Sequence, residues 1–186
     1  MGRKITVLRL GHRVVRDQRV SSHVALTARA LGADEIVFAG DHDPALLESI
    51  SKVVEKWGGG FKASYTQDWR RFLTERKAQG EYVVHLTMYG VGIQDVEEEL
   101  REAYATRGIV LVVGSSKVPI EVYELADINV AVTNQPHSEI AALAIALDRI
   151  HQGKELTISY PDAKITIKPS RLGKLRKKKN SREEIN

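Results

Sequence analysis

The chain has 186 residues, no cysteine and a formal net charge of +4, with 28 Lys and Arg against 24 Asp and Glu. This length is enough for one domain with a buried core, and the absence of cysteine excludes disulfides, thiolate metal sites and cysteine nucleophiles. No apolar run approaches the roughly 20 residues of a transmembrane helix, and the first residues lack the apolar core of a signal peptide. We therefore expect a soluble, cytoplasmic protein with no membrane partner.

The charge is distributed unevenly along the chain. Residues 1–30 carry +6, residues 31–163 carry −9 and residues 164–186 carry +7. Two basic ends on an acidic middle favour a polyanionic partner. A basic tail is, however, also typical of a solvated or disordered end, so the charge alone leaves both interpretations open.

Short β-branched runs alternate with longer stretches of helical periodicity. The expected strands are Lys4–Leu10, Glu35–Ala39, Phe61–Tyr65, Tyr82–Thr87, Ile109–Gly114 and Asp127–Thr133. Most of them lack polar alternation, as strands buried on both faces do. The expected helices are Ser22–Leu31, Pro44–Trp57, Trp69–Gln79, Asp95–Arg107, Ile120–Leu125 and Ser138–Gln152. This alternation predicts an α/β fold with a mostly parallel, six-stranded sheet flanked by helices.

The pattern changes after Gly153. Glu155–Ser159 and Lys164–Lys168 alternate apolar and polar residues around a Tyr-Pro-Asp-Ala turn, which predicts a short β-hairpin. The residues that follow have little apolar content and are expected to be disordered. The sequence thus indicates three parts: a main domain of residues 1–153, a hairpin extension of residues 154–170 and a basic tail of residues 171–186.

The loop after the first expected strand is basic. In open parallel sheets, ligands bind beyond the carboxyl ends of the strands. This loop has no GxGxxG motif, and the chain has no Walker motif, which disfavours an NAD-binding domain or a phosphate-loop NTPase. Its ionisable side chains are His12, Arg13, Arg16 and Arg19. They favour contacts to phosphates of a large ligand, although an arginine stripe paired with acids elsewhere is an alternative.

The loops after the last three expected strands are neutral and rich in glycine, serine and amides. They are residues 87–92, 114–119 and 134–139. Glycine lets the backbone approach a ligand closely, and Asn, Gln and Ser offer neutral hydrogen bonds. Each loop alone is more typical of an ordinary turn, but three of them on adjacent strand ends predict a pocket for a nucleoside-sized molecule.

The histidines do not indicate a metal site. His85 lies within an apolar strand and is expected to be a hydrogen-bonded core residue. The others show no metal-ligand spacing such as HxxxH or HExxH, so no metal is expected. Ser138 precedes a long helical segment and is predicted to be its N-cap. The two tryptophans fall on expected helices and are expected to be core or interface residues.

Five segments together resemble one family. They are LRLGHR at residues 8–13, RDQR at 16–19, HVAL at 23–26, HLTMYG at 85–90 and NVAVTNQPHSE at 129–139. Over about residues 5–170 the chain resembles the archaeal tRNA (cytidine(56)-2′-O)-methyltransferase family, a branch of the SPOUT superfamily. This resemblance implies a deep trefoil knot in the C-terminal half, which sequence reasoning alone would not propose because knots are nearly absent from proteins. It also implies a homodimer and a tRNA substrate.

The same resemblance implies S-adenosylmethionine (SAM) as the cofactor, bound in the knot. The reaction would be methyl transfer to the ribose 2′-hydroxyl of cytidine 56, in the TΨC loop. The residues implied to line the cofactor pocket are Leu86, Gly114, Ser115, Ser116, Lys117, Val118, Val132, Thr133, Asn134, Gln135, Pro136, His137, Ser138 and Glu139. They fall in the loops that the residue pattern had already indicated.

The catalytic group is less well defined by the resemblance. Methyl transfer to a hydroxyl needs alignment and help in removing the hydroxyl proton. Leu26 holds the place of the arginine that many related ribose methyltransferases carry on the first helix. We expect Arg19 to take the role, with Arg16 and Arg13 as alternatives and His23 as a candidate base or substrate contact. The side chains expected to contact RNA are Arg9, His12, Arg13, Arg16, Lys174, Arg176 and Lys177.

Two other functions are compatible with the sequence. One is a non-catalytic RNA-binding protein that uses the same fold and basic ends. The other is a nucleotide-binding enzyme that uses the glycine-rich loops for a different adenosine ligand.

Overall fold

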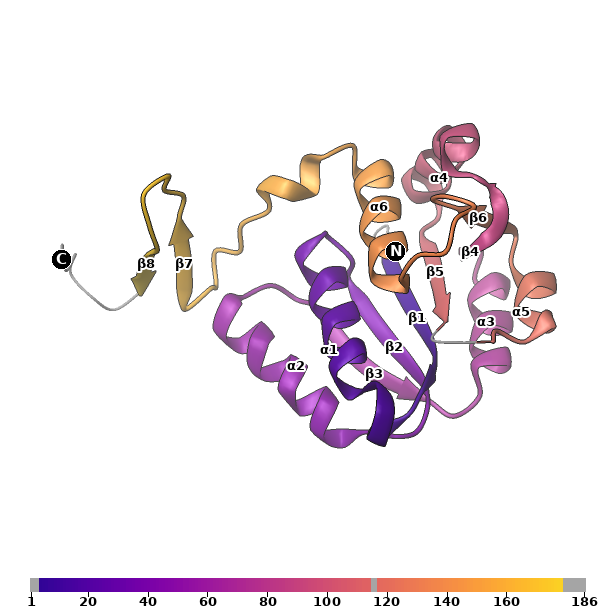
Figure 1. The fold of residues 1–186 in the computed structure, drawn as a ribbon, viewed down its shortest axis with the longest axis horizontal. Coiled ribbons are helices and arrows are strands. Elements are labelled where there is room, and N and C mark those ends of the chain that lie inside the picture. The colour runs from indigo at the N-terminus through magenta and orange to yellow at the C-terminus, as the bar shows by residue number, and fades with distance from the viewer. Residues whose placement is uncertain (1–3, 115–116, 179–186) are drawn as a thin grey trace.

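The computed structural model describes residues 4–114 and 117–178. Its main part is a six-stranded sheet in the order β3-β2-β1-β5-β4-β6, with every neighbouring pair parallel (Figure 1). The strands are β1 Ile5–His12, β2 Glu35–Gly40, β3 Lys62–Thr66, β4 Tyr82–Gly92, β5 Ile109–Gly114 and β6 Ile128–Ala131. The predicted α/β fold with a parallel, six-stranded sheet is confirmed.

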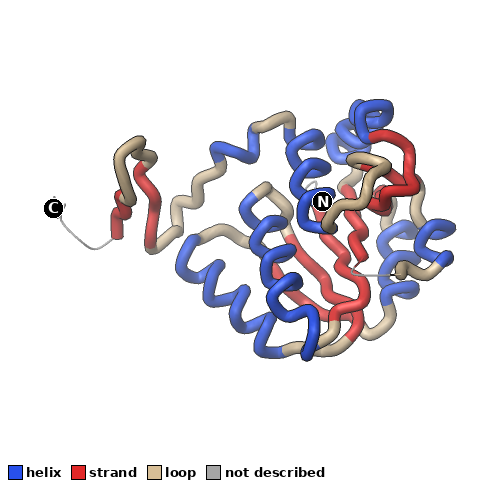
Figure 2. The backbone as a smooth tube through the Cα atoms, in the orientation of Figure 1, coloured by secondary structure: helices blue, strands red, loops and turns tan. Residues whose placement is uncertain are grey.

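Helices cover both faces of this sheet (Figure 2). Over the described residues they are α1 Val14–Ala30, α2 Pro44–Trp57, α3 Trp69–Ala78, α4 Ile93–Thr106, α5 Ile120–Leu125 and α6 Glu139–His151. The helices α1, α2, α4 and α6 pack on one face with strand residues such as Val7, whereas α3 and α5 pack on the other with residues such as Leu8. Successive strand residues point to opposite faces, so continuous apolar runs are buried on both sides. None of the helices described is long and apolar enough to cross a membrane.

Polar caps define where several helices begin. The Asp43 and Asp68 carboxylates accept hydrogen bonds from the backbone N–H groups of Leu46 and Arg71, each at 3.0 Å. The Ser138 hydroxyl accepts one from the N–H of Ala141 at 3.2 Å, which confirms it as the N-cap of α6. These caps satisfy N–H groups that have no partner within the helix.

Two elements are longer than the sequence predicts. Helix α1 begins at Val14, eight residues before the expected start. In this arginine-rich segment the buried side of the helix carries a charged residue, Asp17, in place of an apolar one. Asp17 is paired there with Arg13 and Arg16, and the apolar periodicity of the sequence does not reveal this part of the helix. Strand β4 continues to Gly92, beyond the expected end at Thr87, and its last part bends around β6.

The C-terminal hairpin differs from the prediction. Residues Lys154–Thr157 form a 3-10 helix (η1), so the expectation of a strand at 155–159 is wrong. Instead β7, Ile165–Lys168, pairs antiparallel with β8, Leu175–Lys178, inside the segment expected to be a disordered tail. Residues 179–186 of that tail lie outside the described residues. The alternating pattern predicts that Glu155 lies on the exposed face of a strand, but its side chain is buried in η1.

The segment before the hairpin is attached to the α1 and α2 side of the domain. The Asp162 carboxylate accepts from the Gly59 N–H at 3.0 Å, and Lys164 pairs with Glu55 of α2. Beyond these contacts the hairpin lies apart from the sheet (Figure 1). It therefore carries its basic residues away from the central domain.

Candidate functional site

Asn134 joins the loops that follow β4 and β6. Both Leu86 and Val91 of β4 lie opposite Val130 of β6, so residues 87–90 form an arch at the carboxyl end of β4. The Asn134 side-chain amide donates to the carbonyl oxygens of Met88 at 2.7 Å and Gly90 at 3.2 Å. The predicted cofactor segment at residues 132–139 is therefore tied to the arch, which begins directly after Leu86.

The arch approaches β6 closely because residue 90 is glycine. A Cβ atom at this position would lie 2.5 Å from the backbone of Asn129, nearer than real Cβ atoms come. The Asn129 side-chain oxygen accepts a hydrogen bond from Nδ1 of His85 at 2.8 Å, and the ring of His85 packs edge-on against Tyr123. His85 is thus a buried, hydrogen-bonded core residue, as predicted, and this burial lowers its pKa below the ordinary 6.5.

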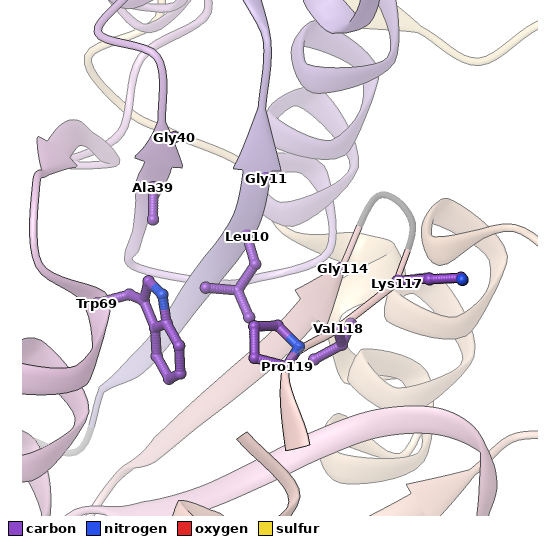
Figure 3. Close-up of a pocket in the computed structure, with 9 residues that line it drawn as sticks. All are labelled: Leu10, Gly11, Ala39, Gly40, Trp69, Gly114, Lys117, Val118 and Pro119. Carbon is purple, nitrogen blue, oxygen red and sulfur yellow. The ribbon is translucent and has the colours of Figure 1, made fainter. Parts of the chain in front are cut away.

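The third predicted segment borders a cavity of about 230 Å³ at the carboxyl ends of β1, β2 and β5 (Figure 3). The residues that line it are Leu10, Gly11, Ala39, Gly40, Trp69, Gly114, Lys117, Val118 and Pro119. Three of the predicted cofactor residues are therefore on this cavity, whereas Leu86 and residues 132–139 are not. Ser115 and Ser116 lie outside the described residues. In the sheet β5 lies between β1 and β4, so the cavity and the arch lie at the ends of different strands.

The sequence interpretation missed part of this cavity. Gly40 ends a strand in the same way as Gly114, so the rule that ligands bind at strand ends would have found it. Trp69 begins α3 and lines the cavity, although its helical position indicated only a core or interface role. The sequence does show that Trp69 follows β3 closely, which places it at the same edge of the sheet as the other strand ends.

Arg9 is not placed to contact RNA. Its side chain is wholly buried, and Nη2 lies 3.4 Å from the Glu139 carboxylate at the start of α6. Burial lowers the pKa of Arg9 against the opposing effect of Glu139. Its Nε and Nη1 have no hydrogen-bond partner among the described residues. The prediction that Arg9 contacts RNA is therefore wrong: its side chain is buried in the core, where it pairs with Glu139, a residue distant in the sequence.

His12 is also buried, so the prediction that it contacts RNA is wrong. Its Nδ1 lies 2.7 Å from the Ser21 hydroxyl, and its Nε2 lies 3.4 Å from the Asp43 carboxylate. All three residues are buried between β1, α1 and the start of α2. This group fixes the end of β1 against the two helices.

Arg13 and Arg16 are exposed, and Asp17 holds both of them. The Asp17 carboxylate accepts from Nε of Arg13 at 3.4 Å and from Nε of Arg16 at 3.1 Å. Burial acts to raise the pKa of Asp17, but the hydrogen bonds from the two arginines and the charges of Arg16 and Arg9 together lower it. The carboxylate is therefore charged at neutral pH and orients the two guanidinium groups.

The three predicted catalytic residues share one face of α1. Arg16, Arg19 and His23 are spaced by three and four residues, and all are exposed. Of the predicted RNA contacts in the C-terminal part, Lys174 is exposed, and Arg176 and Lys177 belong to β8. Within residues 4–114 and 117–178, no group of three or more His, Asp or Glu side chains is placed to hold a metal ion.

Comparison with known sequences identifies relatives across nearly the whole chain. The model of the family described as "tRNA ribose 2′-O-methyltransferase, aTrm56" matches residues 57–177. A tRNA (cytidine(56)-2′-O)-methyltransferase of Methanocaldococcus jannaschii is 54% identical over 178 residues, covering 95% of this chain and 98% of that protein. The protein of the same name from Methanopyrus kandleri is 50% identical, covering 92% and 94%.

Solved structures share the fold at lower identity. A TrmH/SpoU tRNA-modifying enzyme of A. aeolicus superposes with a TM-score of 0.59 at 20% identity, covering 82% of this chain and 76% of that one. The SpoU methyltransferase AviRb of Streptomyces viridochromogenes, solved with the cofactor AdoMet, gives 0.57 at 16% identity, covering 83% and 59%. These structures support a SPOUT-like arrangement of the sheet and helices. With the family match and the identity to the archaeal proteins, they show that the chain belongs to the aTrm56 family of tRNA ribose 2′-O-methyltransferases.

Proposed function

We propose that this protein transfers a methyl group from SAM to the ribose 2′-hydroxyl of cytidine 56 in tRNA, in the cytoplasm. The observation that carries the proposal is the 54% identity, over 95% of the chain, to a protein named for this activity. Of the segments quoted above as family-like, HLTMYG leads into the arch and NQPHSE leads into α6, whereas the other segments of residues 8–26 lie on β1 and α1 or between them.

The arch and the loop after β6 fit a SAM molecule. Thr133, Asn134 and Gln135 offer neutral polar groups for hydrogen bonds to a nucleoside, and Asn134 holds the two loops in one arrangement. Val132, directly after β6, adds apolar surface beside these polar groups. When bound, SAM supplies an activated methyl group, so the protein needs only to orient the reactants and manage the hydroxyl proton.

The exposed face of α1 supplies the groups for that proton. A guanidinium placed near the 2′-hydroxyl stabilises the developing alkoxide and contacts the adjacent phosphate. Arg19 is the first candidate because it forms no ion pair with any described residue, whereas Arg16 is held by Asp17. His23 lies one turn further along the helix and is placed to accept a proton directly or through water. Arg13, Arg16, Lys174, Arg176 and Lys177 would contact phosphates.

The active enzyme in this proposal is a homodimer formed through α1 and α6. Val15, Arg19, Ser22 and Leu26 lie along one face of α1, where Val15 and Leu26 are exposed apolar residues. Ile145 on the adjacent helix α6 is also exposed. Covering this surface with a second copy buries these apolar groups and brings Arg19 to the interface.

The proposed fold also includes the trefoil knot of the superfamily. Support comes from the loop after β6, where Asn134 is bound to both limbs of the arch at residues 87–90. In the proposed knot, the chain after β6 passes through this arch before α6 begins. Such threading would keep the cofactor loops in place without a disulfide.

The test of the function uses unmodified tRNA transcript, the protein and SAM, with nucleoside mass spectrometry as the readout. We expect one methyl group on the ribose of cytidine 56. A transcript with 2′-deoxycytidine at that position lacks the acceptor oxygen and should receive none. Methyl transfer to a base or to another nucleotide contradicts the proposal, and salt-sensitive binding without any transfer would instead support a non-catalytic RNA-binding protein.

A further inference from the structure

The cavity beside segment 114–118 differs in chemistry from the arch. Its walls are mainly apolar: Leu10 and Ala39 come from β1 and β2, Val118 and Pro119 from the segment before α5, and Trp69 from α3. Lys117 is exposed and adds one positive charge. At about 230 Å³ the cavity is smaller than the roughly 300–1,000 Å³ of pockets for drug-sized ligands. It therefore suits one flat ring better than a whole SAM molecule.

The indole ring of Trp69, which lines this cavity, contacts the guanidinium of Arg70. The Arg70 guanidinium lies over it, 4.4 Å from the ring centroid. The same guanidinium donates to the Glu121 carboxylate of α5 at 2.7 Å. This ion pair ties the start of α3 to the start of α5, two residues after Pro119. Trp69 and Pro119 thus face the cavity from separate elements, with Leu10 between them (Figure 3).

The strand ends keep the cavity accessible to a ligand. Gly40 and Gly114 end β2 and β5 at its edge, Gly11 is the last residue but one of β1, and none of the three has a side chain to fill the cavity. Gly40 has a φ of +131°, and a Cβ atom there would lie 2.3 Å from the carbonyl oxygen of His12. Glycine is therefore required at this position for β2 to end beside β1.

We infer that this cavity binds a nucleobase of the tRNA, namely the cytosine whose ribose accepts the methyl group. The inference rests on the proposed function. Enzymes that modify single nucleotides draw them out of the stacked helix and read them in a pocket. A tryptophan face stacks on a base, and a lysine at the rim pairs with the neighbouring phosphate. Gly114, Lys117 and Val118 line the cavity and also belong to a predicted cofactor segment. A base bound in the cavity would therefore have its ribose next to the methyl donor.

The two tryptophans make a direct binding test feasible. Trp57 ends α2, and Trp69 is the only other tryptophan in the chain. The variant Trp57→Phe leaves Trp69 as the sole tryptophan, whose fluorescence is excited selectively over that of tyrosine, and Trp69→Phe is the matched control. We expect quenching of Trp69 by tRNA transcript, much less by a transcript that is abasic at position 56, and none by SAM alone. The Trp57 signal in the control should stay unchanged with each ligand.

Other fluorescence outcomes overturn the inference. Equal quenching by the abasic transcript means that Trp69 responds to tRNA binding without holding this base. Quenching by SAM alone means that the cavity takes the adenine of the cofactor. No quenching by a transcript that the variant demonstrably binds means that no base reaches Trp69. Each of these results leaves the proposed function standing, because methylation by the wild-type protein is measured separately.

Kinetics give an independent readout on folded protein. We expect Trp69→Ala to raise the KM for tRNA by about 5- to 100-fold, as loss of one stacked base does, with the Kd for SAM unchanged. Trp69→Tyr keeps an aromatic ring and should recover most of the loss. An unchanged KM for Trp69→Ala, or equal effects of the two substitutions, contradicts a stacking role.

Discussion

The guanidinium of Arg9 lies 3.4 Å from the carboxylate of Glu139, at the end of β1 and the start of α6. The pair joins the centre of the sheet to the helix that follows the predicted cofactor loop. Arg9 is wholly buried, and most of the Glu139 side chain is buried with it. An ion pair in this position has a large effect when one partner is removed, because the other charge then has no compensation.

Replacing Glu139 with alanine should lower the free energy of unfolding by about 3–5 kcal/mol, since Arg9 would be left as an unpaired buried charge. Urea denaturation of the variant measures this loss. The double variant Arg9→Met/Glu139→Met removes both charges and should recover most of the stability. Glu48→Ala, which breaks an exposed pair with Lys52, is the control and should have no measurable effect. A double variant as unstable as the single one would contradict the explanation.

Asn134 is expected to be essential for cofactor binding. Asn134→Ala removes both hydrogen bonds to the arch, so the two loops lose their link. At roughly 1 kcal/mol for each bond, the affinity for SAM should fall about thirtyfold. Asn134→Asp places a carboxylate against the two carbonyl oxygens and should be worse than alanine. Calorimetry with SAM measures both affinities. Equal effects of the two substitutions would show that the amide contacts do not determine binding.

The sheet could be predicted from the sequence because its strands are continuous apolar runs, and burial on both faces leaves no other simple arrangement for them. The N-terminal half of α1 could not, because four consecutive residues among its first eight, 16–19, are charged or carry an amide. Of these four, only Asp17 is buried, where it pairs with arginines. The burial of Arg9 was equally inaccessible, since its partner Glu139 is far away in the sequence. The alternating pattern at 155–159 predicts a strand there, but residues 154–157 form a 3-10 helix in which Glu155 is buried. The hairpin forms further along the chain, between β7 and β8.

Arg19→Ala should reduce kcat by about 100-fold or more, because the group that stabilises the developing alkoxide is lost. Arg19 is exposed on α1, so the fold and the affinity for SAM should change little. Steady-state methylation and SAM calorimetry separate the two effects. Arg71→Ala, an exposed arginine on α3 paired with Glu75, serves as the matched control and should keep full activity. A collapse of SAM affinity in Arg19→Ala would place this residue in the cofactor site instead.

Stability should fall as the pH drops below about 6.5. Burial lowers the pKa of His85 and of His151, so between the ordinary value of 6.5 and the lower folded value the unfolded chain binds more protons. The folded protein has its full histidine-dependent stability above this range and loses it on acidification. His85→Gln should flatten the decline by at most about 1.4 kcal/mol per pH unit. Denaturation curves at several pH values test this, and an identical slope in the variant would contradict it.

Deletion of residues 170–186 should weaken tRNA binding and make it less sensitive to salt, while the main domain stays folded. The segment includes β8, which pairs with β7 in a sheet of its own and not with the six-stranded sheet. Each phosphate contact contributes about 0.9 to the slope of log K against log salt, so loss of two or more contacts is measurable by filter binding. Deletion of residues 179–186 alone removes two basic and two acidic residues and keeps β8, so it should preserve most of the slope. An unchanged slope in the longer deletion would show that the hairpin does not contact tRNA.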